Sequence, residues 1–145
     1  TKSSILTLYY SMIYPYLQYC NLVWASTYPT NLSRLVLLQK KILRLADKAE
    51  YNAHTNPLFK KMFLLKFQDI QKLQTCQFLF SLCRNSLPSK FHNFCVYNNQ
   101  LHTYNTRLKN LFHLPQTRTK IKQYSLRYEG PKIHNSIQKI KYCST

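Results

Sequence analysis

Residues 3–33 contain no charged side chain, in a chain that carries 21 lysines and arginines. The stretch is long enough for a membrane-spanning helix, which needs about 20 mostly apolar residues. Its composition argues against a span, because its tyrosines, Gln18 and Asn21 would place polar groups in hydrocarbon without hydrogen-bond partners. We therefore expect this stretch to be buried against protein, with no membrane contact.

Apolar residues in the first part of this stretch recur at helical spacing, after Ser3 or Ser4 as a candidate cap. Pro15 lacks an N–H and should kink the helix, so the pattern predicts a bent helix from about residue 4 to residue 25. Its aromatic side chains are too large and numerous for a solvated face. We expect a seam between this helix and the following ones, lined by Tyr9, Tyr14, Tyr16, Tyr19 and Trp24.

The clearest helical pattern covers residues 31–48, with Thr30 or Asn31 as the cap. One arc of this helix is apolar and is formed by Leu32, Leu35, Val36, Leu38, Ile42, Leu43 and Ala46. The opposite arc is basic and is formed by Arg34, Lys40, Lys41, Arg44 and Lys48. A solvated face without a ligand is the alternative interpretation, although such faces usually intersperse Glu with Lys.

The remaining pattern predicts a short helix over residues 57–63 and a longer one from about residue 68 to Arg84. After Pro88 the periodicity loosens, and residues 117–128 fit a short strand or an extended arm. Gly130 predicts a turn before a last short helix that starts at Pro131. We therefore expect an all-α fold, a small helical bundle, with an irregular C-terminal segment for which a short strand or hairpin stays open.

The formal charge of +17 favours a polyanionic partner, because such a surplus repels itself. Nucleic acid is favoured over an acidic membrane, since we find neither a lipidation signal nor a single amphipathic patch. The four acids are scattered and form no carboxylate pair for two-metal chemistry. The five cysteines match no common zinc spacing. We predict no catalytic and no metal-binding residues in this chain.

Six blocks occur here in an order that resembles the C-terminal part of the reverse transcriptases of LINE-type (non-LTR, jockey-like) retrotransposons. They are IYPYLQYCNLVWAST, RLVLLQKKILRL, YNAHTNPLFKKMFLLKFQDIQKLQ, FSLCRNSLPSKFHNF, HTYNTR and SLRYEGPKIHNSI. Where members of this family commonly have Gly-Pro-Lys-x-Trp-Asn, the present chain has GPKIHN, with His134 in the aromatic position.

The resemblance implies a thumb and post-palm fragment of an RNA-directed DNA polymerase, with residues 1–95 as a helical thumb-like body and 96–145 as a basic segment packed on it. The family's catalytic (F/Y)xDD motif is absent, so the chain should not polymerise alone. No cofactor is expected in it, because Mg²⁺ would belong to the missing palm. The implied partners are RNA, an RNA/DNA duplex and the upstream palm and fingers. The implied locations are a cytoplasmic ribonucleoprotein and the nucleus.

The candidate phosphate contacts on the first basic helix are Arg34, Lys40, Lys41, Arg44 and Lys48. In HTYNTR, Tyr104 could stack on an unpaired base while Arg107 and Lys109 hold phosphates. The alternative is that Tyr104 packs on the helical body and Arg107 pairs with Asp69 or Glu129. Further cations are Arg118, Lys120, Lys122 and Arg127. Two rival functions stay open, a helical module that binds an acidic protein surface and a non-functional element relic.

Overall fold

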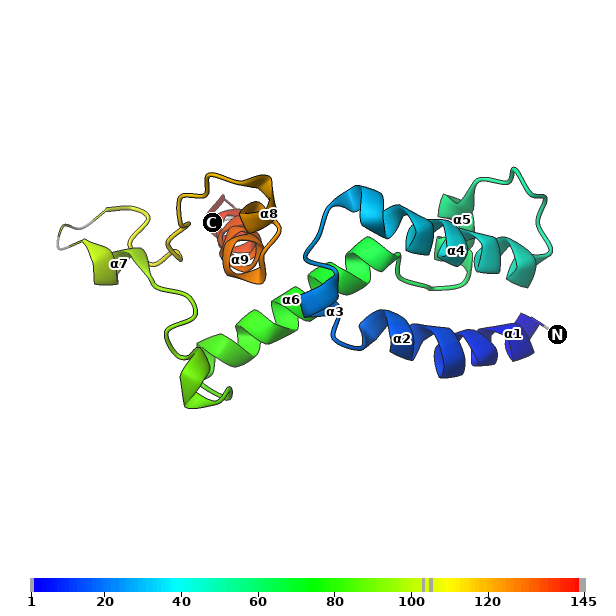
Figure 1. The fold of residues 1–145 in the computed structure, drawn as a ribbon, viewed down its shortest axis with the longest axis horizontal. Coiled ribbons are helices and arrows are strands. Elements are labelled where there is room, and N and C mark those ends of the chain that lie inside the picture. The colour runs from blue at the N-terminus through cyan, green and yellow to red at the C-terminus, as the bar shows by residue number, and fades with distance from the viewer. Residues whose placement is uncertain (1, 103, 105, 144–145) are drawn as a thin grey trace. The chain divides into compact units, whose positions relative to one another are not determined.

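The computed structural model describes residues 2–102, 104 and 106–143, and these residues form an all-α fold (Figure 1). They divide into two compact units, residues 1–74 and residues 75–145, and helix α6 (Phe67–Cys83) contributes to both. This division comes earlier in the chain than the expected boundary between residues 95 and 96. None of the helices in the described part of the chain combines the length and apolar character that a bilayer crossing requires.

The first unit begins with a nearly continuous helix that contains one wide turn. Helix α1 (Lys2–Leu8) passes into the π-helical turn η1 (Tyr9–Ile13) and then into α2 (Tyr14–Gln18). The N–H of Tyr14 bonds to the carbonyl of Tyr9, five residues back, immediately before Pro15. The chain then breaks at Cys20, which is left-handed with φ of 50°, and α3 (Asn21–Trp24) starts in a new direction. The expected single bent helix to residue 25 therefore ends earlier.

Helix α4 (Pro29–Asp47) is the longest helix of this unit and is followed by α5 (Thr55–Lys61). It starts two residues before the expected position because proline suits the first helical turn. Its C-terminus is closed by Lys48 in the left-handed conformation, with the N–H of Ala49 bonded to the carbonyl of Arg44 at 2.9 Å. Helix α5 ends in the same way at Phe63, which has φ of 53°.

Gln39 of α4 ties three segments of the first unit together, although its side chain is only 2% exposed. Its amide nitrogen donates to the Tyr9 hydroxyl and to the carbonyl of Leu65, both at 2.9 Å. Its amide oxygen accepts the backbone N–H of Phe67, also at 2.9 Å. Around it lie apolar side chains that include Tyr9, Leu43, Ala46, Leu58, Phe59 and Met62.

The aromatic seam expected in the N-terminal stretch is confirmed in part. Tyr9 is buried, and Trp24 stacks on Phe67 with ring centroids 5.5 Å apart. Tyr16, within α2, and Tyr19, at its C-terminal cap, are instead 80% and 77% exposed.

The second unit contains the C-terminal part of α6, η2 (Ser89–Phe91), α7 (Asn98–Leu101), α8 (Lys120–Gln123) and α9 (Leu126–Cys143). The expectation of a short strand or extended arm over residues 117–128 is wrong, because most of this segment lies in α8 and at the start of α9. An isolated antiparallel bridge between Tyr97 and Phe112 is the β-type pairing present among the described residues.

The turn expected at Gly130 is also wrong, because Gly130 lies inside α9. A Cβ atom at this position would lie 3.3 Å from a methyl carbon of Leu79 on α6, so the missing side chain lets the two helices approach closely. Helix α9 is further held by Asn135. Its side chain accepts the N–H of Phe112 at 3.0 Å and donates to the carbonyl of Phe112 at 2.8 Å.

His134 packs beside this contact, with its ring centroid 4.6 Å from that of Phe112. Burial lowers the pKa of His134, and a hydrogen bond with Asn135 partly opposes the shift. Its Nδ1 is buried without a hydrogen-bond partner among the described residues, so a protonated ring would leave an N–H unsatisfied.

We expect the second unit to lose stability as the pH falls below about 6.5, because the unfolded histidine then takes up a proton that the folded one resists. The melting temperature, followed by circular dichroism, should be lower at about pH 5 than at about pH 7.5. His134→Phe should show a smaller decline, and equal declines in the two proteins would contradict the prediction.

Candidate nucleic-acid interface

Three exposed cations lie seven positions apart along α4 and its C-terminal cap: Arg34 and Lys41 on the helix, and Lys48 at the cap. Seven positions are nearly two helical turns, or about 10 Å along the helix axis. Among the described residues, no carboxylate lies within ion-pairing distance of any of them. We call these three residues the basic stripe.

The two other candidate cations of α4, Lys40 and Arg44, lie at the edge of this face and are half-buried. The Arg44 Nε donates to the carbonyl of Ala53 at 3.0 Å, so the segment between α4 and α5 covers it. Lys40 borders a cavity of about 130 Å³ beside α5 and the start of α6. The expected set of five phosphate contacts is thus divided into three open and two partly covered positions.

Leucines lie between the cations of the basic stripe, and their exposure was not predicted from the sequence. Leu37 and Leu38 are both 54% exposed, and Leu45 is 73% exposed. The expectation that Leu38 lies on the buried, apolar face of the helix is therefore wrong. The neighbouring residue Gln39 is buried instead. The open face of α4 is consequently cationic and apolar at once.

The acids of the first unit leave the basic stripe uncompensated. Asp47, at the end of α4, forms an ion pair of 2.9 Å with Lys61 of α5. Glu50 and Asp69 form no ion pair within the described part of the chain. In the second unit, Glu129 pairs with Lys132 at 3.5 Å on the exterior of α9.

In the second unit, the candidate residue Tyr104 is 64% exposed and stacks on His102, with ring centroids 5.2 Å apart and an angle of 23° between the ring planes. The expected alternative of a packed Tyr104 is not what the structure shows. Arg107 and Lys109 follow on an exposed loop. The remaining candidates are also exposed. They lie just before α8, within it and at the start of α9, and they are Arg118, Lys120, Lys122 and Arg127.

The perturbed titratable groups do not form a reactive centre. Burial is the largest of the effects that raise the pKa of the Cys95 thiol to about 11 and the pKa of Tyr97 to about 12. Both groups therefore stay protonated at neutral pH, and a protonated thiol is a poor nucleophile. Within the described residues, no three His, Cys, Asp or Glu side chains come together in a way that could hold a metal ion.

No family model matches the chain, and neither a curated protein nor a solved structure is detectably similar to it.

Proposed function

We propose that this chain is a non-catalytic, nucleic-acid-binding C-terminal portion of a LINE-type reverse transcriptase, which holds RNA or an RNA/DNA duplex by its phosphates. The observation that carries the proposal is the basic stripe, with three exposed cations at seven-residue spacing along α4 and its C-terminal cap, and no carboxylate partners among the described residues. Each phosphate contact releases condensed counterions, which makes such a stripe an efficient site for a polyanion.

The stripe supports binding without base selection. Its cations project from α4, whose opposite face is anchored by Leu43 and Ala46 in the core. Side chains at intervals of about 10 Å can each meet a separate phosphate, but they read no base edge. The chain would therefore position nucleic acid for an upstream palm and fingers, which would supply the aspartates and the Mg²⁺ for polymerisation.

The exposed Tyr104 ring supports a second contact, of a different kind. Single-stranded nucleic acid binds to proteins through bases that stack on aromatic rings as well as through phosphates. Tyr104 and His102 already form a stacked pair at the surface of the second unit, followed by Arg107. This pair would take an unpaired base of the RNA.

A second candidate function is supported by the leucines between the cations. A helix face with exposed Leu38 and Leu45, seven residues apart, fits the groove of a partner protein, and the cations would meet an acidic rim. In that case the leucines would supply most of the affinity and the cations mainly the association rate.

A salt titration with unstructured single-stranded RNA tests the proposed function. The logarithm of the binding constant should fall linearly with the logarithm of the salt concentration, with a slope of about −2 or steeper for three or more phosphate contacts. Absence of RNA binding at low salt would overturn the proposal.

A further inference from the structure

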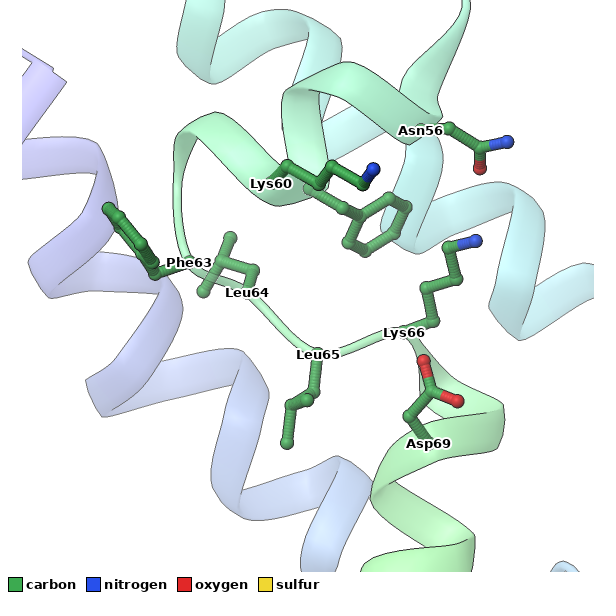
Figure 2. A pocket seen from close by; sticks show the side chains of 8 residues that line it. Asn56, Lys60, Phe63, Leu64, Leu65, Lys66 and Asp69 are labelled. Carbon is green, nitrogen blue, oxygen red and sulfur yellow. The ribbon is translucent and has the colours of Figure 1, made fainter.

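Residues 56–69 of the first unit enclose an open pocket of about 680 Å³, formed by α5, the turn after it and the start of α6 (Figure 2). The size lies in the range of pockets that bind small organic ligands. The pocket does not include any residue of the basic stripe. It adjoins the smaller cavity beside Lys40, with which it shares Asn56, Phe59 and Lys66.

One side of this pocket is cationic. In Figure 2 the head groups of Asn56, Lys60 and Lys66 extend toward the same side of the cavity. The Lys66 ammonium lies 5.9 Å from the centre of the Phe59 ring. Among the described residues, no ion pair neutralises Lys60 or Lys66. Lys40 adds a third lysine, in the lining of the adjoining cavity. The cluster suits an anionic group with several oxygen atoms.

The rest of the lining is apolar, except for one acceptor. Phe59, Leu64 and Leu65 provide apolar surface, and Asp69 stands below Lys66 in Figure 2. The Asp69 carboxylate can accept hydrogen bonds from hydroxyl or amino groups. A ligand that fits all three features has an anion, a planar apolar body and hydrogen-bond donors.

Phe63 lies at the rim of the pocket, and its exposure and backbone conformation are both unusual for a phenylalanine. Its ring is 91% exposed, and its backbone has φ of 53°, in the left-handed region that disfavours a bulky side chain. Phe63 makes little packing contact and does not favour this backbone conformation. A glycine or an asparagine at this position would make the helix end more stable. In Figure 2 the Phe63 ring lies on the side of the pocket away from the Lys60 and Lys66 head groups. An exposed ring in this position is a surface on which the base of a ligand can stack.

From this juxtaposition we propose that the pocket binds a nucleoside 5′-phosphate, either as a free nucleotide or as a nucleotide of a single strand. The phosphate lies between Lys60 and Lys66. The base lies against the apolar lining or the Phe63 ring, and Asp69 accepts a hydrogen bond from the ribose or the base. This site goes beyond the proposed function, because it selects a single nucleotide unit and lies apart from the basic stripe.

Titration calorimetry of the full chain with adenosine 5′-monophosphate, adenosine and inorganic phosphate tests the proposal. The nucleotide should bind more tightly than either of its parts. Lys66→Met keeps the aliphatic stem over Phe59 but removes the charge, and it should lower the affinity for the nucleotide about tenfold or more. The matched control is Lys61→Gln, which changes a neighbouring lysine that does not line the pocket and should leave the affinity unchanged.

Phe63→Asn gives a second, independent test, because asparagine suits the left-handed backbone and should keep or raise the melting temperature. The variant should nevertheless bind the nucleotide several-fold more weakly. A chain that binds the nucleotide no better than inorganic phosphate, or a Lys66→Met variant with unchanged affinity, would overturn the proposal.

The two sources of the ligand and the two surfaces are separable. In a variant that lacks the basic stripe, a single-stranded tetranucleotide that binds more tightly than the mononucleotide would assign the pocket to a strand, and the reverse order would assign it to the free nucleotide. Removal of the basic stripe should leave mononucleotide binding intact. Failure of the proposed function at the stripe would therefore be visible separately from failure at the pocket.

Discussion

Gln39→Ala is expected to lower the free energy of unfolding of the first unit by roughly 3–5 kcal/mol. The substitution removes three hydrogen bonds and leaves the Tyr9 hydroxyl, the Leu65 carbonyl and the Phe67 N–H without this partner. The free energy of unfolding of a whole domain is only about 5–15 kcal/mol, so this substitution should remove a large part of the stability of the first unit. Urea unfolding can be followed by the fluorescence of Trp24, the single tryptophan, which stacks on Phe67.

Tyr9→Phe is the matched control for Gln39→Ala. It removes only the hydroxyl that accepts from Gln39, and it leaves the two backbone contacts of the amide in place, so it should cost about 1 kcal/mol. Equal effects of the two substitutions would show that Gln39 does not connect the segments as the structure indicates.

A triple variant, Arg34→Gln, Lys41→Gln and Lys48→Asn, is expected to weaken binding to single-stranded RNA about tenfold or more at low salt. The slope of the salt dependence should become shallower by about 2, since each lost phosphate contact contributes about 0.7. Asparagine is chosen for position 48 because it suits the left-handed backbone there, so the end of α4 is not weakened. Fluorescence anisotropy with labelled RNA measures both quantities.

The matched control replaces the neighbouring leucines, as Leu37→Gln, Leu38→Gln and Leu45→Gln. It alters the same helix face without changing its charge, so the salt slope should stay as in the unaltered chain. If the leucine variant lost RNA binding and the charge variant kept it, the apolar part of this face would be the part that binds RNA, and the assignment of phosphate contacts to the basic stripe would be contradicted.

The helices were predictable where apolar residues recur at helical spacing on one face. Helix α4 was predicted within two residues of its ends for this reason. Its projection also placed all five cations on one side, but a projection does not show which neighbours cover its edges. The half-burial of Lys40 and Arg44 depends on the segment around Ala53 and Asn56, which no periodicity determines.

Single residues that act against their usual preference explain the other differences. Cys20 takes a left-handed conformation that normally belongs to glycine or asparagine, and the helix that was expected to continue to residue 25 is broken there. Gly130 before Pro131 is typical of a turn, but in this structure it lies inside a helix, where the absence of a side chain allows close packing against Leu79. Gln39 could have been recognised, because it falls on the apolar arc of α4 between Val36 and Leu43.

The pocket was not predictable from the sequence in the same way. Its lining residues come from α5, the turn after it and the start of α6. Its lysines stand among apolar residues and form no recognisable sequence motif. A single signal was present, the bulky Phe63 two residues after a short helix that ends in two lysines.

Lysine footprinting with saturating single-stranded RNA tests the central claim most directly. In this experiment the rate of acetylation of each lysine is measured by mass spectrometry, with and without RNA. We predict that Lys41 and Lys48 become strongly protected, while Lys72, which lies on α6 and outside both proposed sites, reacts as before. Unchanged acetylation of Lys41 and Lys48 under conditions where RNA is bound would contradict the assignment of α4 as the phosphate-binding helix.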